Sequence, residues 1–215
     1  MKFSRRHFLK AAGAGGPGAV AMTTVASVAG VVGLEETAAA QAAPAAPLAI
    51  PAPMTKETGT FNVNGKPMRA QYEARTTLWE VIAVKLGLPG TNRSCNRASC
   101  GACSVLIDGV PVYSCHTLAT EAVGKKIFTV EGLGDEKNLH PLQAVGYRYM
   151  AADCGYCTPG WEVVAKALLD KNNNPTEEQV KAELSGHICR CAAYDAIVRT
   201  VIATGEVLRG EAEIV

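Results

Sequence analysis

The eight cysteines of this 215-residue chain are the residues best suited to chemistry. None occurs before Cys95 or after Cys191, and they fall into two groups of four. The first group has the spacing C-x4-C-x2-C plus a later cysteine, and consists of Cys95, Cys100, Cys103 and Cys115. The second joins C-x2-C to a later C-x-C, and consists of Cys154, Cys157, Cys189 and Cys191. Because thiolates are strong ligands for iron and zinc, both groups are candidate metal centres.

The first group predicts a [2Fe–2S] cluster. Three cysteines within nine residues let one loop reach both irons, and Gly101 lets backbone N–H groups approach the sulfurs. The C-x4-C-x2-C spacing is typical of plant-type ferredoxins, and it lies here in a β-rich segment.

The second group predicts a second [2Fe–2S] cluster. Each of its cysteine pairs lies at or near the start of a predicted helix. The N-terminus of a helix offers free N–H groups and the positive end of its dipole, which favour thiolates and an anionic cluster.

Disulfides and zinc are the alternatives for these cysteines. An exported chain with an even cysteine count is the usual disulfide case, and C-x2-C with C-x-C could form a four-thiolate zinc site. However, Cys189 and Cys191 are too close to pair without strain, and zinc does not account for the plant-type spacing of the first group. Two iron–sulfur clusters are therefore the favoured interpretation.

The N-terminus predicts export. Residues 1–42 have a basic head, an uncharged run and small residues typical of cleavage sites, and Arg5-Arg6 is similar to the twin-arginine motif. That route carries folded proteins, so clusters could be inserted before the chain reaches the periplasm. An uncleaved membrane anchor is the alternative, and otherwise membrane association would come through a partner. Residues 43–55, rich in Ala and Pro, predict an extended tether.

The remaining chain predicts an α+β fold in two domains. Residues 56–133 read as strands and one helix, with hairpin turns at Asn64-Gly65 and Asp108-Gly109. The predicted strands are Thr58–Val63, Met68–Tyr72, Ser104–Ile107, Val110–Tyr113 and Lys126–Val130, and the predicted helix is Thr77–Leu86, ended by Gly87.

Residues 134–215 read as a helical domain. The alternation of apolar and polar residues that is typical of strands stops at this point. A capping box at Thr176 and Gln179 follows an interruption of the helical pattern. The predicted helices are Pro141–Ala152, Pro159–Leu169, Thr176–Leu184 and Tyr194–Leu208.

The rest of the sequence offers little other chemistry. A net charge of +1 gives no electrostatic reason to expect nucleic-acid binding. The chain has no nucleotide-binding glycine motif, catalytic triad or H-E-x-x-H, so we expect no catalytic residue in it. His116, His140 and His187 lie near the cysteines in sequence, but eight thiols already fill two ligand sets, so these histidines are interpreted as loop or interface residues.

From Thr58 to about Leu208 the sequence resembles the small iron–sulfur subunit of the molybdenum hydroxylases, the xanthine dehydrogenase and aldehyde oxidoreductase family. The segments that carry the resemblance are Val63–Gly65, Cys95–Cys103, Val105–Gly109, Val130–Leu133, Cys154–Gly160 and Ile188–Cys191. The resemblance implies a plant-type ferredoxin-like (β-grasp) domain followed by a four-helix-bundle [2Fe–2S] domain. It also implies molybdopterin in a large partner subunit. Electrons would pass through the second cysteine group and then through the first. They would then go to a partner subunit, which would be either a flavoprotein with FAD or a c-type cytochrome with haem c.

The sequence departs from the family pattern near the second group. Where the family commonly has a glutamine whose amide meets the pterin, this chain has Asp153, which the resemblance makes a pterin neighbour. Trp161 and Ala192-Ala193 also replace the usual Met and Thr-Gly, and Ala98 replaces a Gly in the first loop. These differences predict an altered interface with the large subunit.

The resemblance therefore implies an electron-transfer subunit of a periplasmic molybdenum enzyme that oxidises aldehydes. Hydroxylation of N-heterocycles is the alternative reaction. A free-standing periplasmic ferredoxin and a disulfide-stapled binding protein are the alternatives from other functional classes.

Overall fold

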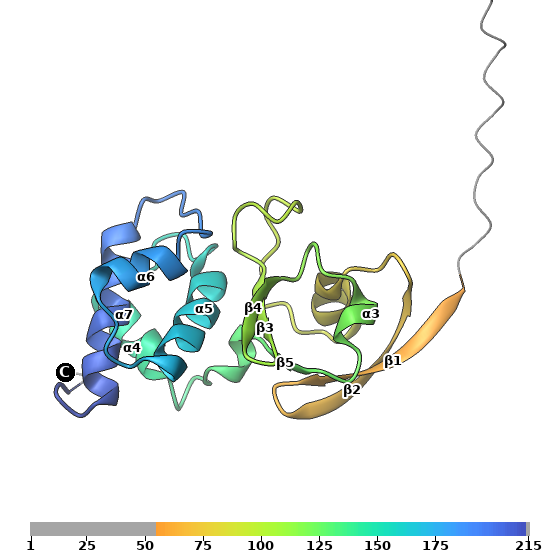
Figure 1. Ribbon diagram of the computed structural model, residues 1–215, viewed down its shortest axis with the longest axis horizontal. Helices are drawn as coiled ribbons and strands as arrows, with labels where there is room; N and C mark the ends of the chain where they lie inside the picture. Colours follow the sequence, from red (N-terminus) through yellow and green to blue (C-terminus); the bar gives the residue numbers. More distant parts are fainter. Residues whose placement is uncertain (1–54, 214–215) are drawn as a thin grey trace, which may run out of the picture. The chain divides into compact units, whose positions relative to one another are not determined.

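The chain forms a five-stranded sheet followed by helices, as a computed structural model shows for residues 55–213 (Figure 1). The predicted signal segment and nearly all of the predicted tether lie outside these described residues. Within residues 55–213, no helix combines the length and the apolar character needed to cross a membrane. The predicted α+β class is confirmed.

Two hairpins supply four of the strands. β1 (Lys56–Val63) pairs with β2 (Lys66–Glu73), and β3 (Ser104–Ile107) pairs with β4 (Val110–Tyr113), both antiparallel. Both predicted turns are confirmed. Asn64 and Gly65 have φ of 50° and 78°, the left-handed geometry of a two-residue turn that matches the strand twist.

The fifth strand joins the two hairpins. β5 (Lys126–Phe128) runs parallel to β1 and antiparallel to β3, which gives the order β2-β1-β5-β3-β4. It is shorter than predicted, because the N–H of Thr129 donates to the Asn64 side chain (2.9 Å) instead of continuing the ladder. A 3-10 turn, η2 (Val130–Gly132), follows, and the short helix α3 (Ala119–Ala122) was not predicted.

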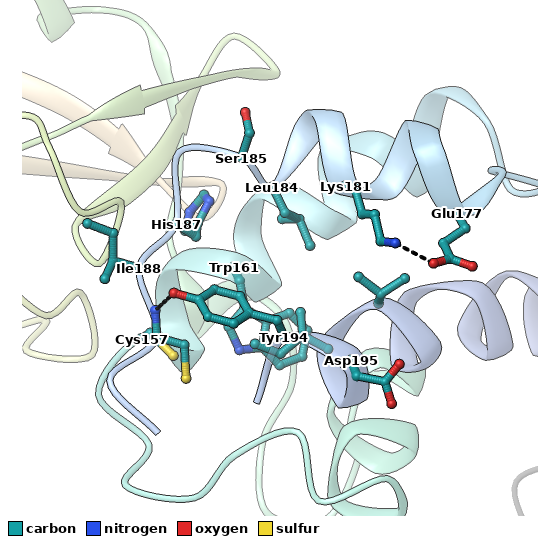
Figure 2. A pocket seen from close by; sticks show the side chains of 13 residues that line it. Cys157, Trp161, Glu177, Lys181, Leu184, Ser185, His187, Ile188, Tyr194 and Asp195 are labelled. Carbon is teal, nitrogen blue, oxygen red and sulfur yellow. Dashed lines mark hydrogen bonds and ion pairs between the residues drawn. The ribbon is translucent and has the colours of Figure 1, made fainter. Parts of the chain in front are cut away.

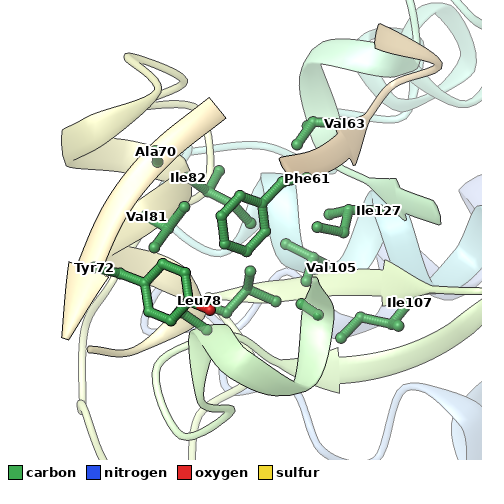
Figure 3. Packing of buried hydrophobic residues seen from close by; sticks show 12 residues of the cluster. Phe61, Val63, Ala70, Tyr72, Leu78, Val81, Ile82, Val105, Ile107 and Ile127 are labelled. Carbon is green, nitrogen blue, oxygen red and sulfur yellow. The ribbon is translucent and has the colours of Figure 1, made fainter. Parts of the chain in front are cut away.

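The predicted helix before the first cysteines is a π-helical segment, η1 (Glu80–Lys85). The N–H of Leu86 donates to the carbonyl of Val81 five residues earlier, at 2.9 Å. Gly87, with φ of 72°, ends the segment as predicted. The side chains of η1 and of the sheet share one core, with Phe61, Val81 and Ile82 fully buried (Figure 3).

The helical half contains four helices within the described residues: α4 (Pro141–Arg148), α5 (Thr158–Lys171), α6 (Glu177–Glu183) and α7 (Tyr194–Leu208). α4 ends earlier than predicted, and Met150 just beyond it has φ of 53°, outside helical geometry. The capping box is confirmed, since the Thr176 hydroxyl accepts from the Gln179 N–H and the Gln179 side chain accepts from the Thr176 N–H.

α5 is the element that connects the two halves. On one side, Trp161 and Ala165 belong to the core of the helices. On another, Val163 and Ala167 pack against Leu106 of β3. Because two faces of one helix contact both layers, α5 fixes the second cysteine group relative to the sheet that carries the first.

Candidate metal centres

The first cysteine set lies on a tightly curled loop between η1 and β3, with its fourth member just after β4. Asn96, Ala98 and Gly101 adopt left-handed φ values of 53°, 54° and 74°, which turns the loop back on itself. The Ser99 N–H donates to the sulfur of Cys95 at 3.4 Å. Cys103 and Cys115 are buried, whereas Cys95 is partly exposed.

The four thiols of this set meet as two pairs. Cys95 interacts with Cys100, and Cys103 interacts with Cys115. The backbone N–H groups of Arg97 and Ser99 lower the pKa of Cys95 to about 7, while burial raises the pKa of Cys103 to about 12. N–H groups that favour a thiolate at one end of the loop also suit a bound anionic cluster.

The second cysteine set lies at the starts of α5 and α7. Cys157 occupies the N-cap position of α5, and Cys189 and Cys191 precede α7. The Ala193 N–H donates to the Cys189 sulfur at 3.4 Å, and the Cys189 N–H donates to the Tyr194 hydroxyl at 2.9 Å. The predicted placement near two helix N-termini is therefore confirmed.

These thiols also meet as two pairs, Cys154 with Cys191 and Cys157 with Cys189. The inner pair is buried, and burial raises the pKa of Cys157 to about 12. Among residues 55–213, no three His, Cys, Asp or Glu side chains gather as they would around one ion. Each set presents its sulfurs as two pairs, and this donor set fits a [2Fe–2S] cluster.

Asp153 lies exposed beside the outer pair of the second set. The charge on Asp153 acts against ionisation of Cys154, although the N–H of Tyr156 and the Cys191 thiol lower the pKa of Cys154 overall. The pKa of Cys191 is raised, because the Cys154 thiol, burial and the Asp153 carboxylate outweigh a backbone N–H at Cys154. Asp153 is thus close enough to influence both outer thiols.

The loops that carry the two sets touch each other. The Ile188 N–H donates to the carbonyl of Cys100 at 3.0 Å, so residues directly beside Cys189 contact a member of the first set. A Cβ at Gly101 would lie 2.6 Å from the Gly186 carbonyl oxygen. Position 101 therefore has no room for a side chain at this contact.

His187, interpreted from the sequence as a loop or interface residue, lies in the loop after α6 and joins this contact. Its Nε2 lies 3.2 Å from the Ser104 hydroxyl, which itself donates to the Gly101 carbonyl at 2.7 Å. Since the hydroxyl proton is used there, Nε2 is the donor to Ser104. Burial lowers the pKa of His187 and favours the neutral ring. His140 caps α4 by accepting from the Leu142 N–H, and His116 is exposed.

A second link joins the same two regions. The Asn92 side-chain amide donates to the carbonyl of Tyr156 at 2.9 Å, and the Tyr156 hydroxyl donates to the carbonyl of Arg93 at 2.8 Å. Arg93 also lies over the ring of Trp79, 3.9 Å from its centroid. The loop before Cys95 is therefore tied to the loop between Cys154 and Cys157.

A cavity of about 450 Å³ opens beside the inner cysteines of the second set (Figure 2). Its lining includes Cys157, Trp161, His187, Cys189 and Tyr194. At its rim, Lys181 and Glu177 form an ion pair of 2.5 Å on α6. The inner pair of the second set thus faces a cavity lined mostly by apolar and aromatic groups.

This chain is similar to known oxidoreductases and to their subunits. The [2Fe-2S] binding domain family matches residues 129–202. One nicotinate dehydrogenase subunit of Pseudomonas putida is 40% identical over 71% of this chain and 97% of its own length. The aldehyde oxidoreductase iron–sulfur-binding subunit of Escherichia coli K12 is 36% identical over 74% of this chain and 76% of its own. The aldehyde oxidoreductase structure from Desulfovibrio desulfuricans is 38% identical with a TM-score of 0.71, and the match covers 74% of this chain and 18% of that one.

Proposed function

Because this chain belongs to the family of small iron–sulfur subunits of molybdenum hydroxylases, we propose that it holds two [2Fe–2S] clusters and transfers electrons within a larger oxidoreductase. The first cluster would be held by Cys95, Cys100, Cys103 and Cys115. The second would be held by Cys154, Cys157, Cys189 and Cys191. Residues 56–133 would form the plant-type ferredoxin domain and residues 134–215 the helical cluster domain.

The observation that carries this proposal is the pairing of the thiols. A cluster with two irons needs two thiolates on each iron, and each set offers its sulfurs as two pairs. The N–H groups of Ser99 and Ala193, each 3.4 Å from a cysteine sulfur, would stabilise the negative charge.

The chain's own residues keep the two centres close to each other. The Ile188 N–H bond to the Cys100 carbonyl joins the ligand loops directly, and the links from Asn92 and Tyr156 support it. When bound, the clusters supply one-electron redox chemistry that lets this chain relay electrons from the molybdenum cofactor of a large subunit to an acceptor. No side chain in this relay makes or breaks a substrate bond.

The surface around Cys154 is the proposed contact with the large subunit. Cys154 and Asp153 are exposed there, and the apolar side chains of Tyr156 and Ile188 are 47% and 55% exposed. Asp153 would face the pterin, where its carboxylate accepts hydrogen bonds. The acceptor partner would carry FAD or haem c and take electrons from the first cluster.

The proposed location is the periplasm and the proposed substrate class is aldehydes. The twin-arginine-like segment around Arg5-Arg6 supports export, and the similarity to the aldehyde oxidoreductase subunit supports the substrate class. The second candidate is hydroxylation of N-heterocycles, which the 40% identity to a nicotinate dehydrogenase subunit favours. Assaying the purified complex with aldehydes and with N-heterocyclic carboxylates decides between the two.

The ligand assignment is tested with the full chain in its complex, reduced anaerobically and examined by EPR. We expect two distinct [2Fe–2S] signals. Cys95→Ser should remove one signal and Cys154→Ser the other, whereas Ser94→Ala in the exposed part of the first loop should keep both. Loss of the same signal in both cysteine variants would show that the two sets do not form separate clusters.

The same preparation separates the proposal from a free-standing ferredoxin. Co-purification with a much larger molybdenum-containing subunit supports the proposal. A chain that carries both clusters but purifies alone from its native cell, with no molybdenum, would favour the ferredoxin.

A further inference from the structure

Trp161 carries a buried hydrogen-bond donor without a protein partner. Its side chain is 1% exposed, and its indole Nε1 has no acceptor among the residues that the structure describes. Leaving a buried donor unsatisfied carries the full desolvation penalty of that group. The chain's other tryptophan, Trp79, shows the ordinary arrangement, because its Nε1 donates to the Thr91 carbonyl at 2.7 Å.

Trp161 lies next to the second cysteine set. The Trp161 N–H donates to the Cys157 carbonyl at 3.2 Å, so the two residues are one helical turn apart on the same face of α5. Trp161 also lines the cavity that Cys157 and Cys189 line (Figure 2). The Tyr194 hydroxyl in this cavity already accepts from the Cys189 N–H.

We propose that the Trp161 indole N–H donates a hydrogen bond to a sulfur of the second cluster and raises its reduction potential. This inference rests on the proposed function, which places the cluster between Cys154, Cys157, Cys189 and Cys191. Reduction adds negative charge to the sulfurs, and a hydrogen bond to a more negative acceptor is stronger. The donor therefore stabilises the reduced state more than the oxidised state. Trp161 acts as a tuning residue, since it supplies no ligand to iron.

The test is a redox titration of the full chain in its complex, followed by EPR of each cluster. In Trp161→Phe we expect the equilibrium constant for reduction of the second cluster to fall about tenfold, which is about 59 mV for a one-electron couple. The potential of the first cluster serves as the internal reference and should not change. An unchanged second potential would overturn the inference.

A substitution that is closer in shape to tryptophan provides a second test if phenylalanine disturbs the core. In a Trp79→Phe background, tryptophan is replaced biosynthetically by benzothienylalanine, which keeps the ring shape at position 161 but has sulfur in place of N–H. Pulsed EPR of the reduced second cluster should show a strongly coupled exchangeable proton with tryptophan and none with the analogue. Retention of that coupling with the analogue would assign it to water and refute the role of Trp161.

The outcomes for the two proposals are distinguishable. Failure of the proposed function would appear in the unmodified chain as an absent second signal. Failure of the Trp161 inference would appear as two normal signals with the same potentials and proton couplings in all variants.

Discussion

Gly160 is the position at which a single methyl group should separate the two cysteine-bearing regions. It lies in the first turn of α5, three residues after Cys157, and is buried. A Cβ there would clash with the carbonyl oxygen of Gly101 and lie 3.0 Å from the Cα of Ala102. Both neighbours are backbone atoms of the loop that carries Cys100 and Cys103, so no flexible side chain can move aside.

The expected magnitude follows from comparison with Gly146, another buried helical glycine. A Cβ at Gly146 in α4 would lie 3.6 Å from Thr200 and from the ring of Trp161, which is ordinary van der Waals contact. Replacing a helical glycine with alanine favours the helix by about 1 kcal/mol at either site. Overpacking at Gly160 should cost about 1–3 kcal/mol. Because the helix contribution cancels, Gly160→Ala should be less stable than Gly146→Ala by about 1–3 kcal/mol.

The assay is urea unfolding of the anaerobic full chain, followed by circular dichroism and by the visible absorbance of the clusters. We expect Gly160→Ala to unfold at lower urea than the parent chain, and Gly146→Ala at equal or higher urea. EPR should show a changed magnetic interaction between the two reduced clusters in Gly160→Ala alone. Equal stability of the two variants would refute the close approach of α5 to the first cysteine loop.

Two further predictions concern the helical half. Burial raises the pKa of the Glu162 carboxyl from 4.5 to about 7. The native state therefore binds this proton more tightly than the unfolded chain does. The free energy of unfolding should fall as pH rises from about 4.5 to about 7. Glu162→Gln should remove that pH dependence and add up to about 3 kcal/mol at pH 8, measured by urea unfolding, whereas the exposed Glu183→Gln should not. Thr176→Ala should lower the free energy of unfolding by about 1 kcal/mol, because it removes the cap of α6. Thr176→Ser should retain most of the stability that the cap provides, and equal urea midpoints for the two variants would argue against the capping box.

Local signals in the sequence predicted most of the secondary structure. Alternation around Asn64-Gly65 predicted a hairpin because only a left-handed two-residue turn follows the twist of the strands there. Tyr194–Leu208 was predicted with its observed ends, since an apolar stripe and a clear start define an amphipathic helix.

Two of the misses, the early end of β5 and the late start of η1, share a physical cause, which is competition from distant partners. β5 stops at Phe128 because the Thr129 N–H bonds to Asn64, 65 residues away. The first N–H groups of the η1 region bond to carbonyls near β4, with Leu78 donating to Thr117 and Trp79 to Ser114. Such bonds replace local ones, and no local pattern predicts them.

The sequence by itself predicted which cysteines would bind metal. Cysteine spacing is a local property, and short intervals such as Cys100 to Cys103 restrict how the sulfurs can be arranged around a cluster. The family also followed from contiguous segments, and sequence comparison confirmed it.

Only the tertiary structure decided how the two cysteine sets meet. The pairing of Cys154 with Cys191 and the bond from Ile188 to Cys100 join segments that are distant in the sequence. The burial of the Trp161 indole N–H depends on the core packed around it. These contacts depend on α5 packing between the sheet and the other helices. Packing between distant elements depends on the shape of both surfaces, which residue spacing along the chain does not specify.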